Sequence, residues 1–302
     1  MARGYSVIYQ VKHRTTFTYT QPVAISNHVL RLIARPHNRQ RCLRSTLTIT
    51  PTPSGRFDGE DFWGNPITYL TIQTPHHTLI VDANNFVEVM KPEAIQVDQS
   101  MPWDHVQTYL HEQTDSSILE AQQFMYDSPY ITVDDATFEF AQTCFPPGRP
   151  LLAGVMDLTH RIYRDFTYQG GVTDVSTPVK DVLTSRKGVC QDFAHLEIAA
   201  LRSLGLPARY VSGYLLTHPP EGQEKLVGAD ASHAWISTWC PHFGWVDFDP
   251  TNNCIPGEEH ITLAWGRDYG DVSPINGFMI GGGHHTLDVS VDVSPASQPL
   301  LV

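Results

Sequence analysis

The sequence has few cysteines, and their arrangement argues against two common ways of stabilising a protein. The 302 residues include only five cysteines, an odd number that cannot all be paired in disulfides within one chain. They are widely spaced, and no two form a CxxC pair or a zinc-type cluster. We therefore expect neither a disulfide framework nor a bound metal ion, and a reactive cysteine must be identified from its local context. The five are Cys42, Cys144, Cys190, Cys240 and Cys254.

Basic residues and long apolar runs are also scarce. Twenty Lys and Arg stand against 32 Asp and Glu, and the formal charge of −12 would repel phosphate backbones and anionic lipids. No stretch approaches the roughly 20 apolar residues of a membrane span, and the N-terminal segment lacks the apolar centre of a secretion signal. We therefore expect a cytoplasmic protein that has no nucleic-acid or membrane partner.

The sequence does contain enough apolar residues for a folded α+β protein. Hydrophobic residues make up 41% of the chain. Between about residues 5 and 90, short alternating apolar runs are separated by turn sequences such as Gly64-Asn65-Pro66. This pattern predicts an N-terminal antiparallel β-sandwich within a β-rich domain over residues 1–95.

Helical periodicity follows the β-rich segment. Asp134 and Asp135 are candidate caps for a helix, and apolar residues from Leu151 to Tyr163 recur at helical spacing. We expect a helical connecting region over residues 96–150 and a core domain over residues 151–302. Alternating apolar residues from Leu287 to Val293 predict a closing strand at the end of the core.

Cys190 stands at the predicted start of a helix that Gly205-Leu206-Pro207 should end. In the first turn of a helix, free N–H groups and the positive end of the macrodipole favour a thiolate over a thiol. The same N–H groups can donate to the oxyanion that forms when sulfur attacks a carbonyl. Cys190 is thus a candidate nucleophile, although a lone cysteine is also commonly a small buried apolar residue.

A hairpin after this helix brings a histidine and an aspartate together. Strands are expected at about 208–216, 232–240 and 245–249, with residues 241–244 as the turn between the last two. If Trp239 pairs with Trp245, Asp249 falls opposite Trp235 and one diagonal step from His233. A carboxylate bonded to one ring nitrogen would leave the other nitrogen facing the sulfur. An incidental polar pair on an exposed strand face is the alternative.

Four blocks in this region resemble the transglutaminase-like core, in the family's order and at familiar separations. The resemblance implies that Cys190, His233 and Asp249 form a triad with the logic of papain-type cysteine peptidases. It favours Asp249 over Asp247, because the family's acid directly precedes a Pro-Thr pair. The blocks are residues 188–195 (GVCQDFAH), 205–214 (GLPARYVSGY), 232–235 (SHAW) and 244–251 (GWVDFDPT).

The resemblance extends to the N-terminus and completes the expected fold. Residues 9–13 (YQVKH) through 30–32 (LRL) are similar to the β-rich region that accompanies this core in bacterial members, while the likeness is thinner over roughly residues 95–150. It implies a papain-like or transglutaminase-like core in residues 151–302, in which a helix-borne cysteine packs on an antiparallel sheet that carries the histidine and the aspartate.

Neighbours of the triad have separate interpretations. Asp192 is expected to cap the helix rather than to take part in catalysis. Gln191 is expected to contact either the substrate or a loop, and His195 to lie in the core or behind the site. Trp235 and Trp245, like Trp239, could line an acyl-binding groove, although aromatic residues on a sheet face commonly serve packing.

The sequence therefore favours acyl transfer at a peptide or amide bond of a peptide or protein substrate, without a cofactor. His233 would act as base and acid, and a thioester would form on Cys190. Attack by water makes the protein a peptidase or amidase, which we favour, and attack by an amine makes it a protein-glutamine transglutaminase. A binding or scaffold protein on the same fold is a further alternative. Metal hydrolysis is disfavoured, because no HExxH motif exists and adjacent histidines such as His76-His77 point to opposite strand faces.

Overall fold

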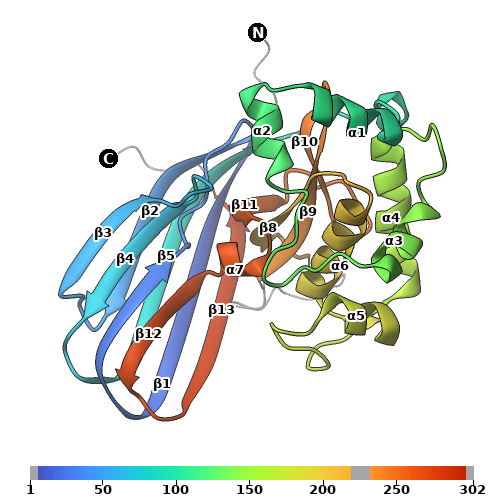
Figure 1. The fold of residues 1–302 in the computed structure, drawn as a ribbon. Coiled ribbons are helices and arrows are strands. Elements are labelled where there is room, and N and C mark those ends of the chain that lie inside the picture. Colours follow the sequence, from blue (N-terminus) through green and yellow to red (C-terminus); the bar gives the residue numbers. More distant parts are fainter. Residues whose placement is uncertain (1–5, 219–231, 297–302) are drawn as a thin grey trace.

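The computed structural model describes residues 6–218 and 232–296 and shows an α+β protein with two lobes (Figure 1). Long strands form the N-terminal lobe, and helices surround a smaller sheet in the other. The α+β class is confirmed. Among the described residues, no helix combines the length and apolarity that a membrane crossing requires.

The N-terminal strands form one sheet, so the expected sandwich of two separate sheets is wrong. The 25-residue strand β1 pairs with β5 along its first half and with β4 along its second, and this joins the two halves of the sheet. Leu30, Ile72 and Val81 meet in the core that the two halves enclose. The strands run in the order β2-β5-β1-β4-β3, with bounds β1 Ser6–Leu30, β2 Gln40–Thr50, β3 Gly55–Glu60, β4 Pro66–Ile72 and β5 His76–Met90.

Two C-terminal strands complete this sheet. Strand β12 (Ile275–Gly281) pairs with the second half of β1, and β13 (His285–Pro295) pairs with the first half. Positive φ angles of 95°, 86° and 62° at Gly281, Gly282 and Gly283 allow the tight reversal between them. The closing strand predicted near residues 287–293 is therefore present, and its partner lies in the N-terminal sheet.

Helices follow the N-terminal strands, as the periodicity predicts, and their apolar side chains share a core with the second lobe. Asp134 caps α3 by accepting a hydrogen bond from the Thr137 N–H at 2.8 Å. Leu151, Leu158 and Ile162 of α4 are fully buried on the face that the apolar spacing indicates. The elements are η1 (Val97–Gln99), α1 (Trp103–Glu112), α2 (Ser116–Gln122), α3 (Asp135–Gln142) and α4 (Leu151–Asp165).

The core lobe packs helix α6 (Cys190–Ser203) on a four-stranded antiparallel sheet, and both the helix and the hairpin match the prediction. Ala194, Ile198 and Leu201 of the helix share a core with Ala234 and Ile236 of the sheet. The strand order is β10-β9-β8-β11, with β8 Ala208–Leu215, β9 Ser232–Cys240, β10 Gly244–Phe248 and β11 His260–Gly266. The remaining elements are β6 (Thr167–Tyr168), α5 (Val179–Ser185), β7 (Lys187–Gly188) and α7 (Tyr269–Val272).

The N-terminal lobe covers part of the core sheet and its β11 edge. Tyr214, Ile261 and Leu263 pack against β1, β5 and β13 in a shared apolar cluster. Side-chain amides from the N-terminal lobe satisfy the edge backbone: Gln40 bonds both N–H and C=O of Thr262, and Asn65 bonds both groups of Trp265. The two lobes are therefore joined by apolar packing and by paired hydrogen bonds.

Gly213 of β8 allows close approach on the sheet face that carries the Trp235 ring. An added Cβ would overlap the Ile261 carbonyl oxygen and the Trp235 ring, whereas a Cβ at Gly257 would meet nothing within 4 Å. We expect Gly213→Ala to lower the free energy of unfolding by about 2–3 kcal/mol, because an overpacked core must shift its backbone. Urea denaturation of Gly213→Ala and of the control Gly257→Ala checks this, and equal losses would contradict the packing described.

Candidate active site

Cys190 is the first residue of α6, and its position is fixed by the turn before it. The Asp192 carboxylate accepts hydrogen bonds from the Val189 N–H and the Thr173 hydroxyl, both at 2.7 Å. A side chain at Gly188 would overlap Asp192, so glycine is required where the chain passes this carboxylate. Burial raises the pKa of Asp192 despite these hydrogen bonds. Asp192 thus supports the helix start, in agreement with its expected capping role.

The hairpin register agrees with the sequence prediction. Trp245 pairs with Trp239, and Phe248 pairs with Ile236. The chain then turns, and Asp249 forms a bridge with Cys254. His233 Nε2 lies 2.7 Å from Asp249 Oδ2, and both side chains are nearly or fully buried. The structure therefore places the carboxylate on the histidine as predicted, while Asp247 instead forms an ion pair with Arg39 at 3.1 Å.

His233 lies between the thiol and the carboxylate. Burial lowers its pKa, but hydrogen bonds to Asp249 and Cys190 and the charges of these two groups outweigh burial and raise the pKa to about 10. Because Nε2 is bonded to Asp249, Nδ1 is the ring nitrogen left for the sulfur. The predicted residues Cys190, His233 and Asp249 are thus brought together in the expected order.

Asp249 has more partners than the sequence indicates. Its Oδ2 also accepts from His260 Nε2 at 3.1 Å and from Asn252 Nδ2 at 2.7 Å, and its Oδ1 accepts from the Thr251 and Asn252 N–H groups. Burial raises the pKa of Asp249, but the hydrogen bonds from His233, His260 and Asn252 hold it well below its usual range. The carboxylate is therefore kept ionised.

His260 and Asn252 were missed by sequence reasoning for different reasons. Asn252 is three residues after Asp249 and bonds it within a turn, so the Asp249-Pro250-Thr251-Asn252 sequence carries a local signal. His260 belongs to β11, a strand that the sequence reading did not predict, and reaches Asp249 only through tertiary folding. No local pattern in the sequence identifies it.

His233, Asp249 and His260 are also residue types that commonly bind a metal ion. Ligand atoms of His233, Asp249 and His260 all lie within 4.8 Å of one another. The hydrogen bonds from both rings to one carboxylate oxygen already account for this closeness. A metal ion would have to replace those bonds.

The adjacent histidines of β5 do not form a metal site together. His76 is buried and His77 is exposed, so their side chains point to opposite faces of the strand as expected.

Other predicted neighbours lie around the triad rather than within it. Gln191 Nε2 donates to the Val175 carbonyl at 3.3 Å, which is the loop contact considered above. Trp235 is fully buried with its ring centroid 6.0 Å from that of His233, so it packs beside the histidine, and it lines only a small cavity that extends to His260. His195 is buried and its Nε2 accepts from the Tyr269 N–H. Trp245 is half-buried and lines a cavity described below.

Glu197 is a buried acid on α6 that sequence reasoning also missed. Its side chain is fully buried and accepts a hydrogen bond from Thr159 at 2.6 Å, while its Oε2 has no partner in the described part of the chain. Burial raises the pKa of Glu197 to about 8, and the negative charge of Asp249 acts in the same direction. Glu197 is therefore largely protonated at neutral pH, which avoids a second negative charge near Asp249.

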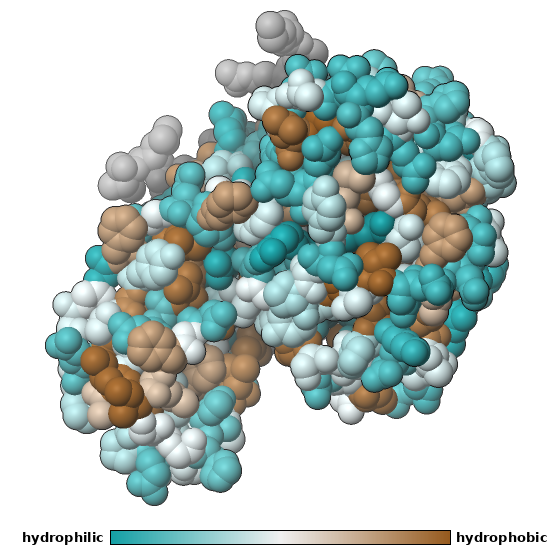
Figure 2. All heavy atoms as spheres, in the orientation of Figure 1, coloured by the Kyte–Doolittle hydropathy of each residue, from teal (hydrophilic) through white to brown (hydrophobic). Residues whose placement is uncertain are grey.

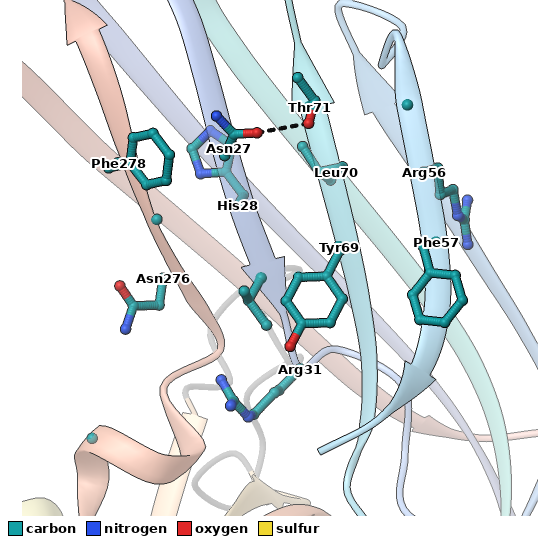
Figure 3. Close-up of a pocket in the computed structure, with 14 residues that line it drawn as sticks. Asn27, His28, Arg31, Arg56, Phe57, Tyr69, Leu70, Thr71, Asn276 and Phe278 are labelled. Carbon is teal, nitrogen blue, oxygen red and sulfur yellow. Dashed lines mark hydrogen bonds between the residues drawn. The ribbon is translucent and has the colours of Figure 1, made fainter. Parts of the chain in front are cut away.

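A cavity of about 630 Å³ lies away from the triad, on the N-terminal sheet (Figure 3). Phe57, Tyr69 and Phe278 surround it on β3, β4 and β12, and Arg31 lies at its end. These rings are among the apolar side chains exposed on this lobe, where brown surface gathers in Figure 2. None of the triad residues lines this cavity.

Comparison with known proteins places these features in a family. The sequence matches the bacterial transglutaminase-like N-terminal region over residues 9–88 and the transglutaminase-like superfamily over residues 139–250. An uncharacterized Mycobacterium tuberculosis protein is 40% identical over 295 residues, covering 95% of this chain and 92% of its own length. An uncharacterized Mycobacterium leprae protein is 33% identical, covering 94% and 98%.

A solved structure shares the fold over nearly the whole chain. It is a Cytophaga hutchinsonii protein described as a candidate cysteine protease, with a TM-score of 0.77, 22% identity, and coverage of 98% of this chain and 93% of its own. A shorter match, 38% identical over 73 residues, is to the protein-glutamine gamma-glutamyltransferase of Pseudomonas aeruginosa, covering 24% of this chain and 11% of that protein.

The cysteines provide a direct test of the site. Burial raises the pKa of Cys42 and Cys144, and raises it to about 12 for Cys240 and about 11 for Cys254. Cys190 alone has a histidine partner at a helix start, so we expect iodoacetamide at pH 7 to alkylate it at least tenfold faster than the others. Peptide mapping by mass spectrometry over a time course measures this.

His233→Ala is the matched control, because it removes the partner of Cys190 and leaves the other four cysteines unchanged. Labelling of Cys190 should slow toward that of the buried cysteines. Equal labelling of all five in the unmodified protein would contradict the assignment of Cys190.

Proposed function

The chain belongs to the transglutaminase-like superfamily, and we propose that it is a cysteine-dependent acyl-transfer enzyme acting on peptide or amide bonds. Cys190 is the proposed nucleophile, His233 the acid and base, and Asp249 the residue that orients the histidine. Hydrolysis is the favoured outcome, so the enzyme would be a peptidase or amidase. The observation that carries the proposal is the His233 ring, which is bonded to Asp249 and whose pKa is raised by interactions with both Asp249 and Cys190.

The proton of the Cys190 thiol moves first to His233 and then to the departing amine. His233 holds the proton of the Cys190 thiol as an imidazolium, and Asp249 stabilises its positive charge. The thiolate attacks the amide carbonyl carbon, and the carbonyl oxygen becomes an oxyanion. When the C–N bond breaks, His233 gives its proton to the departing amine and a thioester remains on Cys190.

The start of α6 supplies donors for the oxyanion. The first backbone hydrogen bond of this helix runs from the Phe193 N–H to the Val189 carbonyl, so the N–H groups of residues 190–192 have no helical partner. These groups and the helix dipole favour negative charge beside the sulfur. One helix end thus serves both the nucleophile and the intermediate.

Water or an amine then resolves the thioester, with His233 accepting a proton from the attacking group. Hydrolysis is favoured because water is always abundant, and an amine competes with it only in a site that excludes water. Transamidation uses the same three residues and is the alternative, supported by the short likeness to a gamma-glutamyltransferase. The nature of the acceptor decides between them.

A peptide library separates these activities. We expect the unmodified protein to release new peptide termini, and Cys190→Ala to release none, because the thioester cannot form. The same reactions run with a labelled primary amine report transamidation as incorporated label. Mass spectrometry measures both products.

Two controls accompany this experiment. Cys42→Ser changes a cysteine of the N-terminal sheet and should leave the rate unchanged. Activity should also persist in EDTA, since the mechanism needs no metal at His233, Asp249 and His260. Equal behaviour of the unmodified protein and Cys190→Ala would sink the enzyme proposal and favour a binding protein.

The pH profile tests the role of Asp249. The raised pKa of His233 means that the imidazolium is present below about pH 10 and is lost above it, so the rate should fall on the alkaline side near pH 10. Asp249→Asn removes the negative partner, and the alkaline limb should move down toward the ordinary histidine value of about 6.5. The maximal rate should fall by about 10³- to 10⁴-fold.

Initial rates measured from pH 5 to 11 check this prediction. Asp82→Asn, which alters an exposed carboxylate paired with Arg14, is the control and should keep the original profile. An alkaline limb that stays in place in Asp249→Asn would show that Asp249 does not set the charge of His233.

A further inference from the structure

A second buried cluster lies between the core sheet and the N-terminal lobe. A chamber of about 260 Å³ is lined there by Arg209, Trp245 and Asp247 of the core sheet, by His37 and Arg39 of the N-terminal lobe, and by Glu120 of α2. Trp265 of β11 forms a further wall. The chamber contains none of the triad residues.

Arg209 has an unusual environment at this chamber. Its side chain is only 5% exposed, and burial lowers its pKa to about 9. Its guanidinium carbon lies 4.1 Å from the Trp245 ring centre and 3.8 Å from that of Trp265. Two aromatic faces therefore hold the cation, which is an arrangement that stabilises its charge.

Stacking on rings does not satisfy the hydrogen-bond donors of Arg209. The five N–H donors of a guanidinium lie in its plane, so rings above and below it accept none of them. Arg209 Nε has no hydrogen-bond partner, and Arg209 forms no ion pair with a carboxylate in the described ranges. Asp247, whose charge acts on Arg209, is bonded to Arg39 instead.

Neighbouring side chains on the same sheet face are also unpartnered. Ser237 pairs directly with Arg209 on one side and with Asp247 on the other, so the three form a row across β8, β9 and β10. Ser237 Oγ and the Trp235 Nε1–H are buried without a partner in the described chain. Buried polar groups are normally satisfied, and of Arg209, Ser237 and Trp235 only Arg209 lines the chamber, so its unpartnered Nε–H is the donor that indicates a missing acceptor there.

We propose that this chamber is a binding site for a carboxylate group, held in the plane of the Arg209 guanidinium between Trp245 and Trp265. A planar carboxylate accepts two parallel hydrogen bonds from a guanidinium, and the flanking rings favour a flat group over a tetrahedral one. The volume of about 260 Å³ suits a small organic acid or the end of a peptide.

The site adjoins the triad without overlapping it. A smaller cavity shares His37, Arg39 and Asp247 with the chamber and extends to His260, which bonds Asp249. A bound carboxylate would therefore lie next to the residues that support Asp249. Its source is either the substrate or a separate small molecule, and kinetics distinguish these.

Acetate and acetamide are the probes, because they have the same shape and differ in charge. At constant ionic strength, acetate should change tryptophan fluorescence and raise the melting temperature in a saturable way, and acetamide should do neither. Inorganic phosphate, which is tetrahedral, should bind more weakly than acetate. Identical effects of acetate and acetamide would overturn the proposal.

Two variants locate the binding. Arg209→Lys keeps the charge but loses the planar pair of donors, and should weaken acetate binding at least about tenfold. Glu120→Gln removes an exposed negative charge that lines the chamber, so its fold should persist, and it should strengthen acetate binding about three- to tenfold. Glu112→Gln is the matched control, because it removes an exposed carboxylate of α1 that does not line the chamber. Unchanged binding in both site variants would overturn the proposal.

Steady-state kinetics of the unmodified enzyme identify the source of the carboxylate. Competition between acetate and a peptide substrate indicates that the chamber receives a carboxylate of the substrate. An effect on kcat at unchanged KM indicates a separate ligand. The binding experiments do not depend on activity, so they remain decisive if the proposed hydrolase function fails.

Discussion

The carboxylate of Asp249 is the interaction on which the site depends. It is fully buried, and its two oxygens accept hydrogen bonds from His233, His260, Asn252 and the backbone. Taking an anion out of water is costly unless donors replace the lost hydration. Here they do, so the charge persists, and a persistent negative charge is what allows His233 to remain an imidazolium beside Cys190.

The sequence could predict those parts of the site that lie within short stretches of chain. The helix start at Cys190 follows from local stop and start signals, and the hairpin register follows from a four-residue turn. Counting along two adjacent strands therefore placed Asp249 near His233. His260 could not be found in this way, because β11 joins the sheet beside β8 and its histidine reaches Asp249 only after the whole sheet has formed.

The N-terminal fold shows the same limit. Alternating apolar residues predicted strands correctly, but alternation says only that one strand face is buried, not which partner covers it. A sandwich and a single folded sheet both satisfy the pattern. The distinction depends on the 25-residue strand β1, which continues through Gln21-Pro22 and joins the two halves. The pairing of β12 and β13 with β1 links residues more than 240 positions apart, which no local signal encodes.

The position of the N-terminal lobe explains why polar residues are buried on the core sheet. Without the N-terminal lobe, the sheet face that carries Arg209, Asp247 and His260 would be exposed to solvent, where charged side chains are hydrated. Arg39 instead forms an ion pair with Asp247 and, with Val89, lines the small cavity beside His260. The lobe thereby lowers the local dielectric around the partners of Asp249, which strengthens their hydrogen bonds and raises the cost of leaving Arg209 unpaired. Covering this face thus both supports the triad and creates the need for an acceptor at Arg209.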